Sequence, residues 1–258
     1  MPGWRLTRFE PTVMAGLAGL LLGSGLAVAQ VDQGRALASV EAAREIARAV
    51  AASPSPGAAP RFDDPRYAEL VDRALDAGVA GSDPADATGL ALLHDMQRAA
   101  GSILRAYLLT GVPSAGGGTL PDEAAGEQAA RNFVAFQPEV GQLYDFRVRV
   151  GSQIAEGCVY LAAVASSDVT TALAVAAVAE EQERILLSAI SVAGDHDVDP
   201  EWRRQRLLAL SESAADYAIL FGRKKAQEIA DRTLSSAMVE QNPAVASALK
   251  DFALALLR

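Results

Sequence analysis

Cysteine and histidine are scarce in this chain. Among its 258 residues there is one cysteine, Cys158, and there are two histidines, His94 and His196. A single cysteine cannot form an intramolecular disulfide, and the Cys-x-x-Cys motif of thiol redox proteins and c-type haem proteins is absent. The Glu-x-x-His motif that di-iron bundles need is also missing, because alanine stands three positions before each histidine. These absences exclude three common redox functions of helical proteins.

Basic residues are outnumbered: 23 lysines and arginines stand against 32 aspartates and glutamates, which gives a formal net charge of −9. An acidic surface keeps a protein soluble and disfavours nucleic acid and anionic lipid as partners. The chain also lacks the Gly-x-Ser-x-Gly, His-Glu-x-x-His and phosphate-loop motifs of common enzymes. We therefore predict no cofactor and no catalytic residues.

The first 29 residues have the composition of a secretory signal peptide. Arg5 and Arg8 supply a short basic region, and residues 11–29 carry no charge. The stretch ends in Ala-Val-Ala, the small-x-small pattern after which signal peptidase cuts. We expect cleavage before Gln30 and a periplasmic or secreted protein, which would contact a membrane only if residues 1–29 stayed uncleaved.

Helix starts are the clearest local signal in the remaining sequence. Four times an Asp or Asn that can cap a helix precedes a proline at the first helical position: Asp64-Pro65, Asp83-Pro84, Asp199-Pro200 and Asn242-Pro243. Apolar residues recur at spacings of three and four, and no run alternates with a period of two. We therefore predict an all-α protein, an antiparallel bundle of roughly eight helices. The predicted helices span residues 31–52, 65–79, 84–110, 122–136, 139–166, 168–193, 200–240 and 243–257.

The N-terminal helix is predicted to be tethered to the rest of the chain. Residues 53–63 form a linker rich in Pro, Ser and Ala between a helix over residues 30–52 and an all-helical domain over residues 64–258. The helix carries an apolar stripe of six residues: Ala36, Val40, Ala43, Ile46, Ala47 and Val50. Such a stripe either docks on the chain's own body or lies in the groove of a partner.

The most apolar part of the mature chain spans residues 158–179, in which Asp168 is the one charged residue. Ser166 and Ser167 precede this aspartate and interrupt the segment, and each half is too short to cross a bilayer. We predict a buried αα-hairpin rather than a membrane span. Small side chains on one face of its first helix would let a neighbouring helix approach closely: Gly151, Ala155, Cys158 and Ala162.

The densest polar sequence is Gly-Asp-His-Asp-Val-Asp, which ends at Asp199. Asp195, Asp197 and Asp199 alternate as the first oxygen ligands of a calcium-like cation do. The sequence then departs from an EF-hand loop, because Pro200 stands where that loop needs glycine and Arg206 where it needs glutamate. The alternative is an ordinary connection in which the glycine ends one helix and the last aspartate caps the next.

The histidines suggest one further hypothesis. The order His94, His196-Asp197 and then Asp216 or Asp231 resembles the His, His-Asp and Asp set of histidine–aspartate phosphohydrolases, over those residues alone. This resemblance implies a metal-dependent hydrolase. The alternative interpretation of His94 is that it belongs to a solvated helix face.

A basic patch follows Gly222. Arg223, Lys224 and Lys225 form either a solvated face or a site for an acidic partner.

With no catalytic set recognised, we expect an exported, non-enzymatic protein that acts by binding another protein. The first alternative is a bundle that encloses an apolar, lipid-like molecule, which the aromatic residues Tyr144, Phe146 and Tyr160 suggest. The second alternative is the metal-dependent hydrolase.

Overall fold

The computed structural model describes residues 33–53, 55–71, 74–75, 87–112, 123–164 and 169–258. All regular structure in these ranges is helical and none of it is β-strand, so the predicted all-α bundle is confirmed. The helices are α2 (Gln33–Ala51), the 3₁₀ turn η2 (Pro56–Ala58), α3 (Pro65–Val71), α5 (Ala87–Leu109), α6 (Glu123–Ala135), α7 (Gln137–Val164), α8 (Val169–Ala193), α9 (Pro200–Glu212), α10 (Ala214–Val239) and α11 (Pro243–Ala255).

Helices α9 and α11 begin at the predicted caps. Asp199 Oδ1 accepts a hydrogen bond from Trp202 N at 2.9 Å, and Asn242 Oδ1 accepts one from Val245 N at 3.2 Å. In both helices proline takes the first position, where its missing N–H is not needed. The start predicted at Pro84 lies outside the described residues.

Residues 200–240, predicted as a single helix, form two helices, and the second of them is kinked. Helix α9 ends at Ser213, whose N–H donates to the Leu210 carbonyl, and α10 begins at the next residue. Gly222, with φ 76° and ψ 161°, then kinks α10. Residues with a Cβ rarely adopt this backbone conformation, so glycine is suited to the kink. The prediction of one continuous helix is wrong, because apolar spacing of three and four continues across both interruptions.

Helix α7 lies at the centre of the molecule and contacts α5, α6, α8, α9 and α10. Three residues of the predicted small-residue face are buried, namely Gly151, Ala155 and Cys158. The fourth, Ala162, is exposed. A Cβ at Gly151 would collide with the hydroxyl of Tyr217 from α10. Close approach of other helices therefore depends on the small residues in the middle of α7.

The N-terminal helix docks on the body of the protein. Helix α2 packs along α5, and four side chains of its apolar stripe join the core with exposures of 6% or less: Val40, Ala43, Ile46 and Val50. Of the two alternatives for this stripe, the structure therefore shows docking on the chain's own body.

The segment predicted as a linker also contacts the body. Tyr107 Oη donates to the Pro60 carbonyl at 2.7 Å, and Glu139 Oε1 accepts from Arg61 Nε at 3.1 Å and from Phe62 N at 2.6 Å. These contacts correct the expectation that the segment sets α2 apart. Its sequence has no apolar periodicity, and specific contacts with the body therefore cannot be predicted from it.

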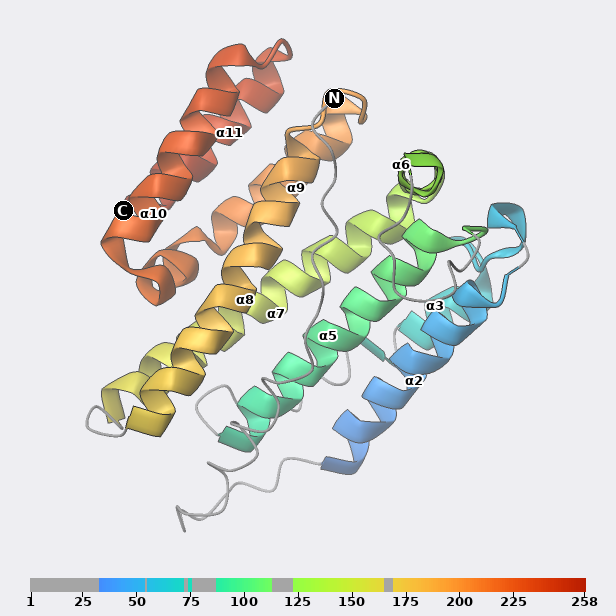
Figure 1. Ribbon diagram of the computed structural model, residues 1–258, viewed down its shortest axis with the longest axis horizontal. Coiled ribbons are helices and arrows are strands. Elements are labelled where there is room, and N and C mark those ends of the chain that lie inside the picture. Colours follow the sequence, from blue (N-terminus) through green and yellow to red (C-terminus); the bar gives the residue numbers. More distant parts are fainter. Residues whose placement is uncertain (1–32, 54, 72–73, 76–86, 113–122, 165–168) are drawn as a thin grey trace.

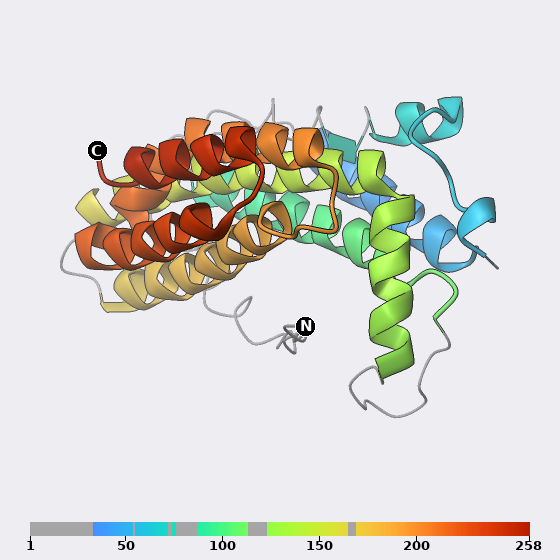
Figure 2. The ribbon, with the colours of Figure 1, turned by 90° about the horizontal axis from the view of Figure 1, so that it is seen from above.

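The remaining helices define the outline of the molecule. Figures 1 and 2 place α10 and α11 at the opposite end from α2 and α3, and α6 runs across the other helices in Figure 2. Among the described helices, none combines the length and the apolar character that a bilayer span requires.

Candidate functional site

Polar side chains from four helices meet at Gly151 in the middle of α7. Gln97 of α5 and Gln182 of α8 are joined by two hydrogen bonds of 2.9 and 2.8 Å, in which each amide nitrogen donates to the other's oxygen. Tyr217 Oη of α10 donates to the Val148 carbonyl at 3.1 Å. A Cβ at Gly151 would lie only 2.6 Å from Gln182 Oε1 and 2.9 Å from Gln97 Nε2. We call this cluster, together with His94, Glu181 and Arg147, the polar junction.

A buried histidine–glutamate pair belongs to the polar junction. His94 Nε2 lies 2.8 Å from Glu181 Oε2, and the two residues are 2% and 8% exposed. Burial acts to raise the pKa of Glu181, but the hydrogen bond from His94 and the nearby Arg98 and Arg184 outweigh it and hold the pKa below its usual range. The interpretation of His94 as part of a solvated face is wrong, because its side chain is buried and hydrogen-bonded to Glu181 of α8.

Arg147 brings a positive charge into the same junction. The residue is 8% exposed, and its backbone carbonyl accepts from Gln97 Nε2 at 2.8 Å. Its guanidinium packs against α5, where a Cβ at Gly101 would lie 3.3 Å from Cζ, and Nε has no hydrogen-bond partner. Burial lowers the pKa of Arg147, whereas Glu181 and two tyrosines act to raise it. The carboxylate of Glu181 therefore accompanies the buried positive charge of Arg147 and is also hydrogen-bonded to His94.

The polar junction contains an acid–base pair but gives it no access to a substrate. A general acid or base must come within about 3 Å of the proton that it transfers. His94 and Glu181 are instead hydrogen-bonded to each other beneath the surface. A buried network of this kind fixes how helices meet, since each group leaves a costly unsatisfied partner if it moves. We interpret the junction as structural.

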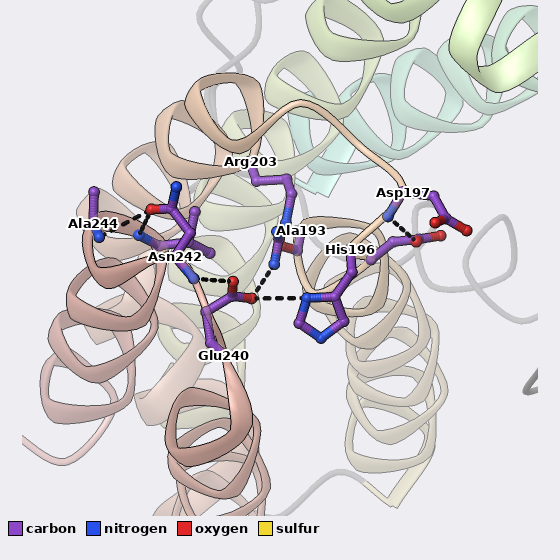
Figure 3. Close-up of polar contacts among 9 residues, drawn as sticks. Ala193, His196, Asp197, Arg203, Glu240, Asn242 and Ala244 are labelled. Carbon is purple, nitrogen blue, oxygen red and sulfur yellow. Dashed lines mark hydrogen bonds and ion pairs between the residues drawn. The ribbon is translucent and has the colours of Figure 1, made fainter.

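A buried ion pair joins the ends of three helices (Figure 3). Arg203 and Glu240 form a salt bridge with both side chains 2% exposed, and Arg203 Nε donates to the Ala193 carbonyl at 2.8 Å. Glu240 Oε1 accepts from Asn242 N at 2.8 Å, and His196 Nδ1 lies 3.5 Å from Glu240 Oε2. This cluster ties the connection between α8 and α9 to the connection between α10 and α11.

The aspartates predicted as cation ligands lie in the first of these connections. Asp195 Oδ1 accepts from Asp197 N at 3.0 Å, and Asp199 caps α9. Within the described part of the chain, no group of three or more His, Cys, Asp or Glu residues is arranged to hold a metal ion. The structure therefore does not bring the three carboxylates together as a ligand set, and it shows the helix cap of the alternative interpretation.

The residues that resemble a phosphohydrolase set have separate partners. His94 contacts Glu181, and His196 contacts Glu240. Asp216 accepts a hydrogen bond from the Ser152 hydroxyl of α7. The structure thus supplies no common centre for the hydrolase hypothesis.

The basic patch lies just beyond the kink of α10. Lys225 Nζ pairs with Glu183 Oε1 at 3.3 Å and with Glu228 Oε2 at 3.4 Å, whereas Arg223 and Lys224 are exposed. One of the three cations is therefore engaged within the chain. An acidic partner for the other two stays a prediction.

Two of the aromatic residues that suggested an apolar ligand belong to the core. Tyr144 and Phe146 are 5% and 3% exposed, and the Tyr144 hydroxyl shares a hydrogen bond of 3.2 Å with Ser188. The cavity beside Tyr144 and Trp202 holds about 10 Å³, which is room for one water molecule. A lipid-like ligand needs on the order of 300 Å³ or more, so this cavity cannot hold one.

Several apolar side chains are exposed at the far end of the α7–α8 hairpin. Tyr160, Val164, Val169 and Leu173 are 51%, 68%, 72% and 67% exposed. Four alanines between and beside them are exposed too: Ala162, Ala163, Ala172 and Ala176. We call these eight residues the tip surface. The hairpin itself agrees with the prediction from sequence, but its expected burial is wrong at this end, which lies at one corner of the molecule in Figure 1.

Comparison of the chain with protein-family models, with curated proteins and with solved structures finds no match.

Proposed function

We propose that this chain is an exported protein without enzymatic activity, which acts by binding another protein through the tip surface. The observation that carries the proposal is the exposure of eight apolar side chains at one end of a hairpin, in a chain with a net charge of −9. Single exposed apolar residues are ordinary, whereas several of them near one end of two neighbouring helices are expected at an interaction site.

The base of the hairpin supports this proposal. The polar junction joins α7 and α8 to α5 and α10 through hydrogen bonds between buried side chains, such as the pair formed by Gln97 and Gln182. A docking surface gains affinity when its backbone is already held in the bound arrangement, because less conformational entropy is lost on binding. The junction therefore suits a rigid arm that presents its far end to a partner.

Site-specific cross-linking in the producing cell tests the docking surface. A photoreactive residue at Leu173 should give a discrete adduct with one protein species. The matched control is Met238 on α10, which is 76% exposed and so at least as accessible as Leu173. The same adducts from both positions, or no adduct from Leu173, would show that the tip surface is not a specific docking site.

The mass of the protein recovered from an extracytoplasmic extract tests export. A chain that begins at Gln30 has the mass expected after removal of the predicted signal peptide. A full-length chain confined to the cytoplasm would contradict this part of the proposal.

A further inference from the structure

The tip surface exposes enough apolar side chain to form one half of a small protein interface. Its four large side chains are between 51% and 72% exposed, and exposed alanines lie among them. Pairing two such surfaces removes on the order of 1,000 Å² from water, which is the size at which specific interfaces begin.

Exposed charged residues border the tip surface on its body side. Glu156 and Glu180 are exposed on the body side of the two arms, and no charged residue occurs in residues 157–164 or 169–179. An apolar centre with a charged rim is typical of surfaces that bury each other. The rim therefore marks where the contact ends on each arm.

The sequence between the two arms argues against a lipid bilayer as the occupant. Ser166, Ser167 and Asp168 join the arms, so a hairpin entering a membrane by its far end would carry these polar residues deepest. An aspartate in hydrocarbon is costly, and the net charge of −9 is repelled by anionic lipid.

We propose that the occupant of the tip surface is a second copy of this chain, so that two α7–α8 hairpins pack into a four-helix bundle. The inference rests on the proposed function, because it names the protein that docks there. The tip combines alanines with Val164, Val169 and Leu173, and this mixture of small and large side chains lets helices interlock. A twofold axis places the same apolar patch on both sides, so the interface is self-complementary and needs no further component.

Sedimentation of the purified mature protein over a range of concentrations tests the proposal. We expect a monomer–dimer equilibrium at micromolar concentration. Leu173→Lys should weaken it about 100-fold or more, because the symmetric interface receives the charge twice. Met238→Lys, at a residue of 76% exposure near the buried Glu240 cluster, should leave the equilibrium unchanged. A protein that stays monomeric at every concentration overturns the proposal.

A cysteine introduced at the tip gives a second readout. The one native cysteine, Cys158, is buried, so Leu173→Cys creates a single accessible thiol. A bismaleimide linker should then yield a species of twice the monomer mass, which Met238→Cys should not yield. Equal yields from the two variants would overturn the twofold contact at the tip.

The outcomes separate this inference from the proposed function. A monomeric protein whose Leu173 cross-links in the cell to a chain of another mass overturns the second copy and leaves the docking surface intact. Co-flotation with phosphatidylcholine vesicles that is lost in Leu173→Lys overturns the second copy and also the choice of a protein partner. A monomer that shows neither behaviour overturns both proposals.

Discussion

The two ends of the α7–α8 hairpin have opposite chemistry. At the base, Gln182 is 0% exposed and Glu181 is 8% exposed, so polar groups lie inside the protein. At the tip, Val164 and Leu173 are 68% and 67% exposed, so apolar groups lie in water. Polar residues are therefore buried at one end of the hairpin and apolar residues are exposed at the other, and both features depart from the usual distribution.

The difference shows that side chains at the base interact within the chain, whereas those of the tip surface remain exposed. At the base, Gln182 is paired with Gln97 and Glu181 with His94, and such buried polar groups contribute to specificity once they are paired. The apolar side chains of the tip surface remain accessible to a partner, because no described element buries them. A comparison of variants at the two ends can test this contrast directly.

The largest expected difference is in thiol reactivity. Cys158, at the boundary between base and tip, is 1% exposed, and burial raises its pKa to about 12. In the Leu173→Cys variant, the tip thiol should react with a maleimide at pH 8 roughly 1,000-fold faster than Cys158, from the difference in thiolate fraction alone. Mass spectrometry of both sites in one dilute sample measures the ratio. Rates within tenfold of each other would mean that Cys158 is not buried as the structure shows.

A methyl group at the base should cost much of the stability. Gly151→Ala places a Cβ against Tyr217, Gln182 and Gln97, and it should lower the free energy of unfolding by about 2–4 kcal/mol. Urea denaturation measures the change. The control is Gly126→Ala on α6, where nothing lies within 4 Å of the new Cβ, and we expect it to raise stability by about 0.5–1 kcal/mol. A Gly151→Ala protein as stable as the wild type would contradict the polar junction.

The carboxylate of the junction should make a contribution that depends on pH. At pH 7, Glu181→Gln should lower the free energy of unfolding by about 1–3 kcal/mol, because His94 and Arg147 lose a charged partner. The pKa of Glu181 is lower in the folded protein than in the unfolded chain. Its contribution is therefore complete well above the unfolded pKa of 4.5 and is lost as the pH falls through the folded pKa.

The difference between wild type and Glu181→Gln should accordingly shrink toward zero near pH 3. The exposed neighbour Glu180 supplies the control, because Glu180→Gln should change stability little at either pH. A difference that is as large at pH 3 as at pH 7 would show that the Glu181 charge is not what matters.

The sequence predicted where helices begin better than it predicted which residues are buried. Caps such as Asp199 and Asn242 are local, because a side chain and the next turn determine them, and the structure confirms both. Burial of His94 requires α8, which lies more than 80 residues away along the chain, and nothing near His94 indicates it. The local spacing of apolar residues likewise predicted that the hairpin is helical. It could not predict that the side chains at the far end are exposed.

Some features do have a local signal in the sequence. Gly222 precedes the basic patch, and a glycine inside a helical pattern also indicates a kink. Arg147, Gln97 and Gln182 carry no motif at all, and their roles follow only from the packing of α5, α7 and α8 around Gly151.

Stability of the Leu173→Lys variant tests the contrast between base and tip most directly. Urea unfolding of this variant should be measured at a concentration where the wild type is monomeric, so that association does not contribute. Because Leu173 is 67% exposed, the free energy of unfolding should stay within about 0.5 kcal/mol of the wild-type value. A loss of about 2 kcal/mol or more would show that Leu173 is buried in the folded monomer, and it would contradict the open apolar tip on which the account depends.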